Sequence, residues 1–164
     1  MRNKQLFCII RKKRRITKNL FEVTRLLKNI ENCISPELIK FLMEMGHGDR
    51  VVIADANFPA AANAKNLVRA DGISGDEMLE AILKLMPIDT YREHAVSFMQ
   101  HGEEIEEVPI WKVYEQLIQA ANEPFTVEYL ERFAFYEEAA NSYLIIATSE
   151  KQLYANVILT KGVL

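Results

Sequence analysis

The hydrophobic and polar positions of residues 27–164 alternate between short apolar runs and longer amphipathic stretches, a pattern typical of strands and helices packed in layers. The apolar runs predict strands at 51–54, 94–99, 143–148 and 157–160, and an alternating stretch predicts one more at 126–132. The amphipathic stretches predict helices at 36–45, from 75 to near Pro87, at 110–121 and at 133–141. This order of elements predicts a single layered α/β domain.

Capping and turn residues mark where several of these elements begin and end. Ser35 followed by Pro36 is a helix start, because serine caps the backbone and proline suits the first helical position. Ser74 and Glu77 have the spacing of a capping box. Residues 58–60 are predicted to be a loop, and the Asp-Gly pair at 71–72 a turn.

The stretch from residue 45 to 59 joins a histidine loop to a strand that ends in a carboxylate. His47 lies between two glycines, and Asp55 follows the predicted strand 51–54 directly. Because α/β folds bind ligands at the carboxyl ends of strands, this stretch is a candidate site. A structural interpretation stays open, in which His47 is an incidental loop residue and Asp55 caps a helix. His94 and His101 have no partner at ligand spacing and are predicted to be surface residues.

Charge is divided unevenly between the first residues and the rest of the chain. Residues 1–26 hold nine of the 20 Lys and Arg residues but one of the 23 Asp and Glu residues. The remainder is acidic, which argues against nucleic-acid binding because phosphate would be repelled. We predict residues 1–26 to be a flexible extension; the alternative is a basic segment that binds nucleic acid or anionic lipid.

Two further features bear on where the protein works. The apolar patch at 6–10 is too short for a signal-peptide core or a membrane span. Cys8 and Cys33 form neither a zinc-ligand pattern nor a disulfide framework. We therefore predict a cytoplasmic protein with no membrane partner and no metal.

The candidate chemistry lies in polar groups at the ends of predicted elements. The motifs of nucleotide, dinucleotide, acyl-transfer and zinc-protease sites are missing from the sequence. What remains is a set of proton-transfer and neutral hydrogen-bonding groups: His47, Asp55, Arg132, Tyr136, Tyr154 and Asn156. Such a set suits a polyol better than a phosphate.

Five short motifs follow one another along residues 27–164: MGHGD at 45–49, DANFP at 55–59, RADG at 69–72, RFAFYE at 132–137 and YAN at 154–156. Together they resemble the fucose mutarotase branch of the ribose pyranase and fucose mutarotase family. The resemblance implies a ribose pyranase-like mixed sheet flanked by helices, with residues 27–164 as the sugar mutarotase domain. Gly48 and Arg132 favour the fucose branch over the ribose branch. Asn57 departs from it, because many members of the fucose branch have histidine there.

The resemblance also implies roles for individual residues in an isomerase that needs no cofactor. His47 matches the proton donor, Asp55 and Arg132 match substrate-binding positions, and Tyr154, Ala155 and Asn156 match the closing binding segment. A ring-shaped homo-oligomer, commonly a decamer, is implied as well, with sites near the subunit boundaries.

The residue chemistry agrees with this interpretation. Mutarotation removes the proton of the anomeric hydroxyl, protonates the ring oxygen and then recloses the ring, so one acid and one base suffice. A histidine, with a usual pKa of about 6.5, takes either role near neutral pH. We predict that His47 transfers a proton and that Tyr154 or Tyr136 is the second group. Two alternatives stay open: the same reaction on D-ribose, and a non-catalytic protein that only binds a monosaccharide.

Overall fold

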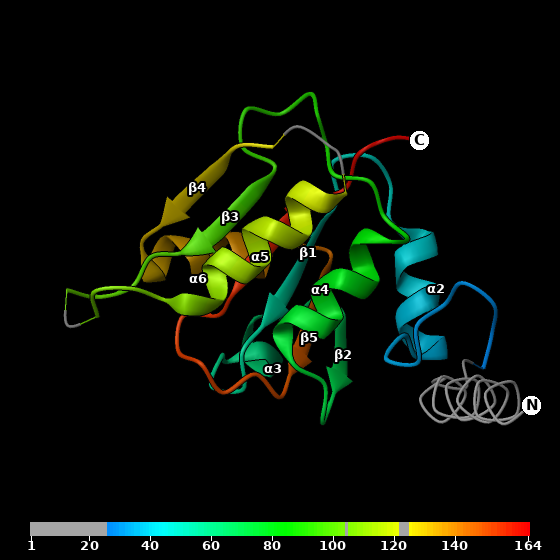
Figure 1. Ribbon diagram of the computed structural model, residues 1–164, viewed down its shortest axis with the longest axis horizontal. Helices are drawn as coiled ribbons and strands as arrows, with labels where there is room; N and C mark the ends of the chain where they lie inside the picture. Colours follow the sequence, from blue (N-terminus) through cyan, green and yellow to red (C-terminus); the bar gives the residue numbers. More distant parts are fainter. Residues whose placement is uncertain (1–25, 104, 122–124) are drawn as a thin grey trace, which may run out of the picture. The chain divides into compact units, whose positions relative to one another are not determined.

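The computed structural model describes residues 26–103, 105–121 and 125–164. The strands within these residues are β1 (Arg50–Ala54), β2 (Leu67–Ala70), β3 (Val96–Met99), β4 (Val127–Leu130), β5 (Leu144–Thr148) and β6 (Val157–Thr160). They form one sheet in the order β2-β5-β1-β6-β3-β4 (Figure 1).

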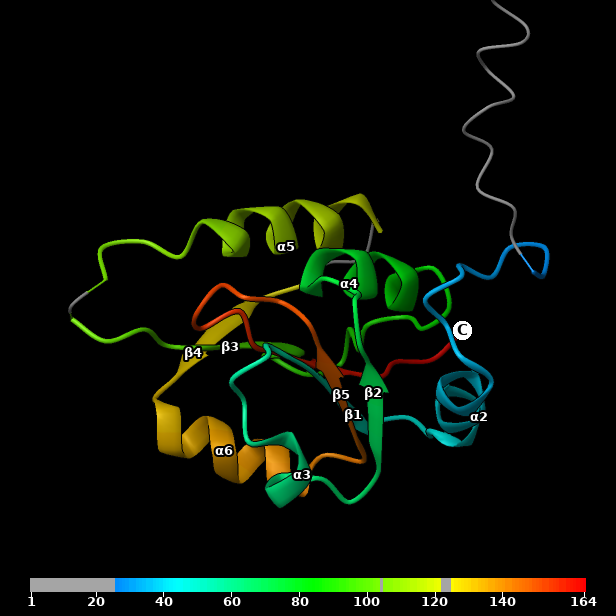
Figure 2. The same cartoon turned by 90° about the horizontal axis from the view of Figure 1, so that it is seen from below.

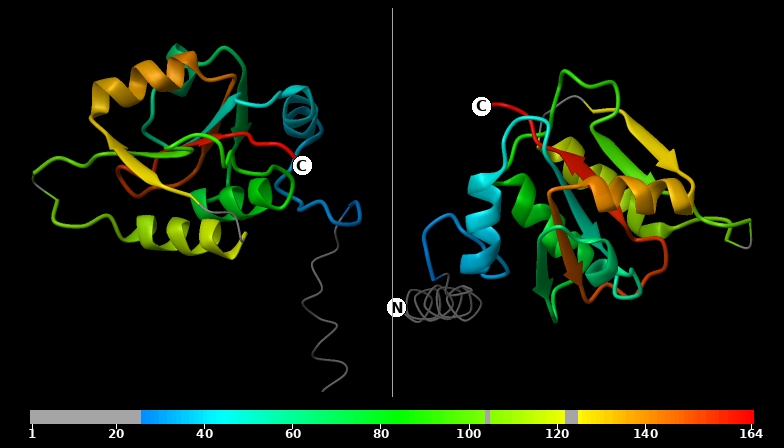
Figure 3. Two further views of the ribbon diagram at one scale, coloured as in Figure 1. Left: turned by 90° about the horizontal axis from the view of Figure 1, so that it is seen from above. Right: turned by 180° about the vertical axis from the view of Figure 1, so that it is seen from behind.

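Strand directions in the sheet bring one set of strand ends to a common edge. β1 pairs in parallel with β5, β5 with β2, and β3 with β4. β6 runs antiparallel to its neighbours β1 and β3 (Figure 3). The carboxyl ends of β1 to β5 and the amino end of β6 therefore lie at the same edge, the edge where α/β sheets bind ligands.

Helices cover both faces of the sheet. Their bounds are α2 Pro36–Glu44, α3 Ala60–Asn63, α4 Gly75–Leu83, α5 Pro109–Ala120 and α6 Arg132–Asn141. Figure 2 shows α4 and α5 on one face, α3 and α6 on the other, and α2 beside the sheet. The prediction of a mixed sheet flanked by helices is thus confirmed.

Burial in the core explains why these segments form strands and helices. The last four residues of β1 and all of β5 and β6 are buried, as expected for central strands covered on both faces. On α4 the buried residues Met78, Leu79 and Ile82 recur at helical spacing and face the sheet. Burying a side chain of this size stabilises the fold by about 1.5–3 kcal/mol.

The structure differs from the predicted elements in three places. Helix α3 begins at Ala60, the last residue of the predicted loop 58–60, because three successive alanines after Pro59 favour a helical turn. β2 is a strand that the sequence pattern did not indicate, since its edge position exposes Arg69. Arg132 was expected to end a strand but begins α6, because the side chain of Glu131 caps that helix by accepting the N–H of Phe133 at 2.7 Å.

The two predicted helix starts have different outcomes. Ser35 caps α2 as expected, with its Oγ accepting the N–H of Leu38 at 3.1 Å. The capping box at Ser74 is wrong, because the Ser74 hydroxyl donates to Asp76 instead of accepting a backbone N–H of α4. The N–H of Gly75 donates to Glu150 at 3.3 Å, so a distant carboxylate caps this helix.

Residues 26–32 belong to a unit separate from residues 33–164. They form a turn that an isolated bridge between Leu27 and Ile30 closes. The predicted flexible extension lies, apart from residue 26, outside the described residues, and the domain boundary after residue 26 stays a prediction. Within the described part of the chain, no helix is long and apolar enough to cross a bilayer.

Candidate functional site

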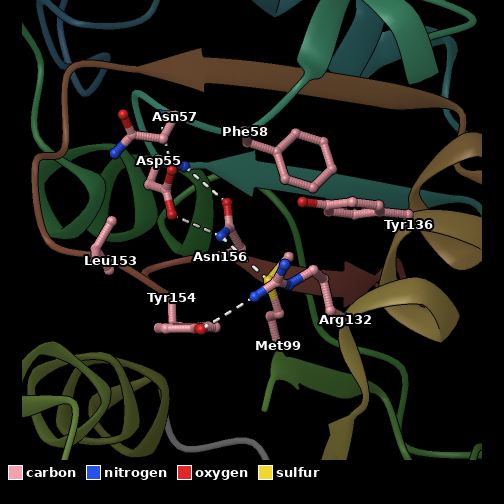
Figure 4. Close-up of a pocket in the computed structure, with 9 residues that line it drawn as sticks. All are labelled: Asp55, Asn57, Phe58, Met99, Arg132, Tyr136, Leu153, Tyr154 and Asn156. Atoms are coloured by element: carbon pink, nitrogen blue, oxygen red, sulfur yellow. Dashed lines mark hydrogen bonds between the residues drawn. The ribbon is translucent and has the colours of Figure 1, made fainter. Parts of the chain in front are cut away.

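A pocket of about 230 Å³ opens at the sheet edge where β1 and β3 end and β6 begins (Figure 4). It is smaller than the roughly 300–1,000 Å³ of pockets for drug-sized ligands, so it suits a small molecule. Its lining comes from the loop after β1, the end of β3, helix α6 and the loop before β6: Asp55, Asn57, Phe58, Met99, Arg132, Tyr136, Leu153, Tyr154 and Asn156.

A reciprocal pair of hydrogen bonds between Asp55 and Asn156 forms the floor of the pocket. The backbone N–H of Asp55 donates to Asn156 Oδ1 at 2.9 Å, and Asn156 Nδ2 donates to Asp55 Oδ2 at 2.7 Å. The N–H of Asn57 donates to the other carboxylate oxygen at 2.9 Å. The end of β1 and the start of β6, far apart in sequence, are thereby fixed to each other (Figure 4).

Burial also sets the electrostatics of Asp55. Removal from water raises the pKa of its carboxyl above the usual value, although hydrogen bonds from the Asn57 N–H and the Asn156 amide act to lower it. A carboxylate kept in a buried pocket at a desolvation cost is typical of functional sites.

Helix α5 holds the backbone of the segment that supplies Tyr154. Tyr154 has a φ of 62°, a left-handed conformation that is rare for a bulky side chain and costs about 1–3 kcal/mol. The indole N–H of Trp111 donates to the Tyr154 carbonyl at 3.0 Å, and the hydroxyl of Tyr114 donates to the Ala155 carbonyl at 3.3 Å. These two bonds keep the segment in a shape that turns the Tyr154 ring into the pocket.

We expect Trp111→Phe to lower the free energy of unfolding by about 1–2 kcal/mol, because it removes the indole N–H and part of a packed ring. Stacking on Phe98, now at 5.7 Å between centroids, is available to the new ring. The measurement is urea-induced unfolding. Tyr129→Phe is the control, since it removes an exposed hydrogen bond to Glu115 within the same aromatic group. An equal loss in both variants would contradict the assigned role of the indole.

Helix α6 contributes Arg132 and Tyr136 from one side of the pocket. These residues are four positions apart and so lie on the same helix face. Arg132 Nη2 donates to the hydroxyl of Tyr154 at 3.4 Å, and the Tyr136 ring packs edge-on against Phe58 at 5.3 Å. Figure 4 shows the hydroxyl of Tyr136 directed toward the side of the pocket that holds Asn156.

The structure brings most of the sequence-predicted site together. Asp55, Arg132, Tyr136, Tyr154 and Asn156 all line the pocket. The side chain of Ala155 does not, because it is fully buried, so any contact it makes with a ligand comes from its backbone.

Four lining residues were missed by the sequence reasoning: Asn57, Phe58, Met99 and Leu153. Met99 ends a predicted strand and Asn57 lies two residues after Asp55, so both positions carried a signal. The other two are apolar loop residues: Phe58 lies within the DANFP motif and Leu153 directly precedes the YAN motif, but apolar side chains there look the same as core residues.

His47 lies at the other end of β1 from Asp55. The five residues of β1 span about 17 Å, and the N–H of Gly48 donates to the carbonyl of Lys161, just after the far end of β6. The His47 imidazole instead contacts Asp89, with Nε2 at 3.3 Å from Oδ2. His47 is therefore not in the pocket of its own chain, and its role as proton donor stays a prediction.

The pocket offers ligand hydroxyls several kinds of partner. Asp55 accepts hydrogen bonds, Arg132 donates them, and the phenols and the Asn156 amide do either. Phe58, Met99 and Leu153 add apolar surface at separate places in the lining. Among the described residues, no group of three or more His, Cys, Asp and Glu side chains is placed to hold a metal ion.

Comparison with known proteins agrees with this geometry. The sequence profile of the RbsD / FucU transport protein family matches residues 28–164. This chain belongs to that family. The resemblance inferred from the five motifs is thereby confirmed.

Fucose mutarotases are among the similar members of the RbsD / FucU family. The fucose mutarotase of Mus musculus is 44% identical over 145 residues, which cover 84% of this chain and 95% of that protein. The crystal structure of the fucose mutarotase of Streptococcus pneumoniae in complex with L-fucose superposes on this chain with a TM-score of 0.82. The match covers 84% of this chain and 99% of that one, and the sequence identity is 47%. The structure of Bacillus subtilis RbsD complexed with D-ribose superposes with a TM-score of 0.64 over 80% of this chain and 95% of that one, and its sequence identity is 26%.

Proposed function

We propose that this protein is an isomerase that interconverts the α and β anomers of L-fucose. The observation that carries the proposal is the match to the Streptococcus pneumoniae structure in complex with L-fucose, at 47% identity over 84% of this chain. The match to the D-ribose-bound structure is weaker, at 26% identity. The fucose reaction is therefore favoured over the ribose reaction.

The polar and the apolar residues of the pocket both suit this sugar. L-Fucose is a 6-deoxy hexose, so it presents hydroxyl groups together with a methyl group. Asp55, Arg132 and Asn156 are placed to hydrogen-bond the hydroxyls, and Phe58, Met99 and Leu153 offer apolar surface to the methyl group. D-Ribose has no such methyl group and would leave the apolar surface of the pocket less well covered.

The reaction needs one group to remove a proton and another to supply one. Removal of the anomeric hydroxyl proton and protonation of the ring oxygen break the bond between C1 and that oxygen, which leaves an open-chain aldehyde. Rotation about the C1–C2 bond and the reverse proton transfers close the ring on the other face. In our proposal His47 transfers one proton, Tyr154 or Tyr136 transfers the other, and Asp55 and Arg132 hold the sugar.

Since His47 and Asp55 lie at opposite ends of β1, we propose that His47 acts in the pocket of a second copy of the chain. This requires a homo-oligomer, and the family resemblance implies a ring, commonly a decamer. Leu153 lines the pocket and is 54% exposed, and Phe133 lies beside the pocket and is 71% exposed. Both side chains supply apolar surface for contact with a second copy.

We also infer a cytoplasmic location and no nucleic-acid or membrane partner, from the sequence features described above.

The wild-type protein is expected to accelerate exchange between the anomers of L-fucose, because the pocket matches that sugar. The measurement is magnetisation-exchange NMR of L-fucose at equilibrium, with D-ribose in parallel as the control sugar. Acceleration of D-ribose alone would place the protein in the ribose branch. Saturable L-fucose binding without faster exchange would make it a non-catalytic binding protein.

A further inference from the structure

An exposed aromatic ring lies beside His47, at the opposite end of β1 from the pocket. Tyr91 is 78% exposed, more than Phe133 or Tyr129. Its ring meets the His47 imidazole edge-on, with the two centroids 5.9 Å apart. A ring that stays in water gains little of the free energy of apolar burial, so packing within the fold does not account for a large aromatic side chain here.

Backbone hydrogen bonds to the end of β6 fix Tyr91 and His47 relative to each other. The N–H of Tyr91 donates to Asp89 Oδ1 at 2.9 Å, and the N–H of Asp89 donates to the last carbonyl of β6 at 3.0 Å. On the other side, the N–H of Gly48, next to His47, donates to the Lys161 carbonyl just after β6 at 2.9 Å. A molecule that meets the His47 imidazole therefore also meets the ring of Tyr91.

The pocket of one chain leaves part of its apolar surface open to water. Leu153, one of the apolar residues of the lining, is more than half exposed. A methyl group contributes most to affinity when apolar surface removes it from water on all sides. In the arrangement proposed above, the second copy that brings His47 to the pocket is placed to supply the missing cover.

The structure of the sugar places its methyl group near the atoms that react. In the pyranose form of L-fucose the ring oxygen is bonded to C1, which carries the anomeric hydroxyl, and to C5, which carries the methyl group. The reacting oxygens and the methyl group thus share one edge of the sugar. A pyranose is about as wide as the distance between the rings of His47 and Tyr91, so a sugar in contact with the imidazole is within reach of Tyr91.

We propose that Tyr91 enters the pocket of the second copy together with His47 and covers the methyl group of L-fucose, which makes it a specificity-determining residue for a 6-deoxy hexose. The inference rests on the proposed function, in which His47 acts across subunits. Tyr91 transfers no proton in this role. Its ring supplies the contact, and its hydroxyl is not required.

Tyr91→Ala tests this inference with two sugars, L-fucose and D-arabinose. D-Arabinose has the ring stereochemistry of L-fucose but has no C6, so it lacks the methyl group. We expect the Kd for L-fucose, measured by isothermal titration calorimetry, to rise by about 5- to 10-fold, near the lower end of the effect of one methylene contact in a hydrophobic pocket. The Kd for D-arabinose is expected to stay within about twofold, because the lost contact is to a group that this sugar lacks.

The rate of L-fucose exchange separates a sugar contact from an effect on His47. The kcat of Tyr91→Ala is expected to stay within about twofold of the wild type, because the proton-transfer groups are intact. A fall in kcat with both Kd values unchanged would mean that Tyr91 acts only on the imidazole beside it, which would overturn the proposal. So would an equal rise of the Kd for both sugars.

Two further variants serve as controls. Tyr91→Phe keeps the ring and is expected to match the wild type; weak L-fucose binding in this variant would assign the contact to the hydroxyl and overturn the role of the ring. Glu93→Ala truncates another side chain of the same loop, one that is 88% exposed, and is expected to keep both Kd values and kcat.

Nuclear Overhauser effects detect the contact directly, even if Tyr91→Ala fails to assemble. In perdeuterated protein with protonated tyrosine, we expect effects between the C6 methyl protons of bound L-fucose and the ring protons of Tyr91. The Tyr91→Phe protein, with its phenylalanine deuterated, identifies these signals by their loss. The absence of any signal from Tyr91 would overturn the inference.

The inference and the proposed function fail in different ways. Wild-type Kd values in Tyr91→Ala beside an inactive His47→Ala would refute the role of Tyr91 alone. Full activity in His47→Ala would refute the proposed function of His47 itself.

Discussion

His47→Ala is expected to slow L-fucose anomer exchange by about 10²- to 10⁴-fold, which is the usual contribution of a positioned acid or base. The sugar is held by other groups, Asp55 and Arg132, so its Kd is expected to change little. Exchange NMR gives the rate, and isothermal titration calorimetry gives the affinity. A lower rate with an unchanged Kd indicates a proton-transfer residue, whereas a residue that only binds the sugar would change the Kd.

The control for this variant is His94→Ala, which removes another partly exposed histidine that lies outside the pocket. We expect it to keep the wild-type rate. Circular dichroism and the mass of the oligomer show whether each variant folds and assembles. Full exchange activity in a folded His47→Ala protein would show that another group transfers the proton.

The same variant tests whether the site is shared between copies. His47→Ala retains an intact pocket, and Arg132→Ala retains an intact His47. After the two proteins are dissociated, mixed and reassembled, mixed oligomers contain some sites with both functional groups, so part of the activity is expected to return. No recovery in oligomers shown by mass spectrometry to be mixed would contradict a contribution of His47 across subunits.

Residues next to strong local patterns were predictable from the sequence. Asp55 follows the apolar run at 51–54 and Asn156 precedes the run at 157–160, so their placement at strand ends needed no knowledge of the tertiary fold. Their direct contact was not predictable, because it depends on β6 lying antiparallel beside β1. Periodicity gives the positions of strands along the chain but not their order in a sheet.

Closeness in sequence misleads for His47. It is eight residues from Asp55, which suggests one site, yet an extended strand between two residues moves them to opposite edges of the sheet. The contact between His47 and Asp89 was not predictable either, because it depends on both residues lying beside the end of β6 and the segment after it. The site that we propose for His47 therefore arises from tertiary and quaternary structure.

Asn156→Asp is expected to lower the free energy of unfolding at neutral pH by about 3–5 kcal/mol, because two buried carboxyl groups would then lie in contact. Asn156 Nδ2 lies 2.7 Å from Asp55 Oδ2, so the substitution places two buried carboxylates in contact. The two carboxyl groups cannot both be ionised at this distance, so one of them retains its proton in the folded state. Asn63→Asp is the control, because it makes the same charge change on α3, where the exposed side chain donates to the Pro59 carbonyl.

The cause of the stability loss in Asn156→Asp can be identified from its pH dependence. The folded variant keeps a proton that the unfolded chain releases near pH 4, so folding binds protons between that pH and the raised pKa of the pair. Stability of the variant is therefore greatest at acid pH and is lost as the pH rises through this window. Urea-induced unfolding at about pH 5 and pH 8, with the wild type measured alongside, is expected to show the larger deficit at the higher pH. An equal deficit at both values would assign it to the lost amide hydrogen bond, and the contact between Asp55 and Asn156 would then stabilise the site by geometry, not by charge.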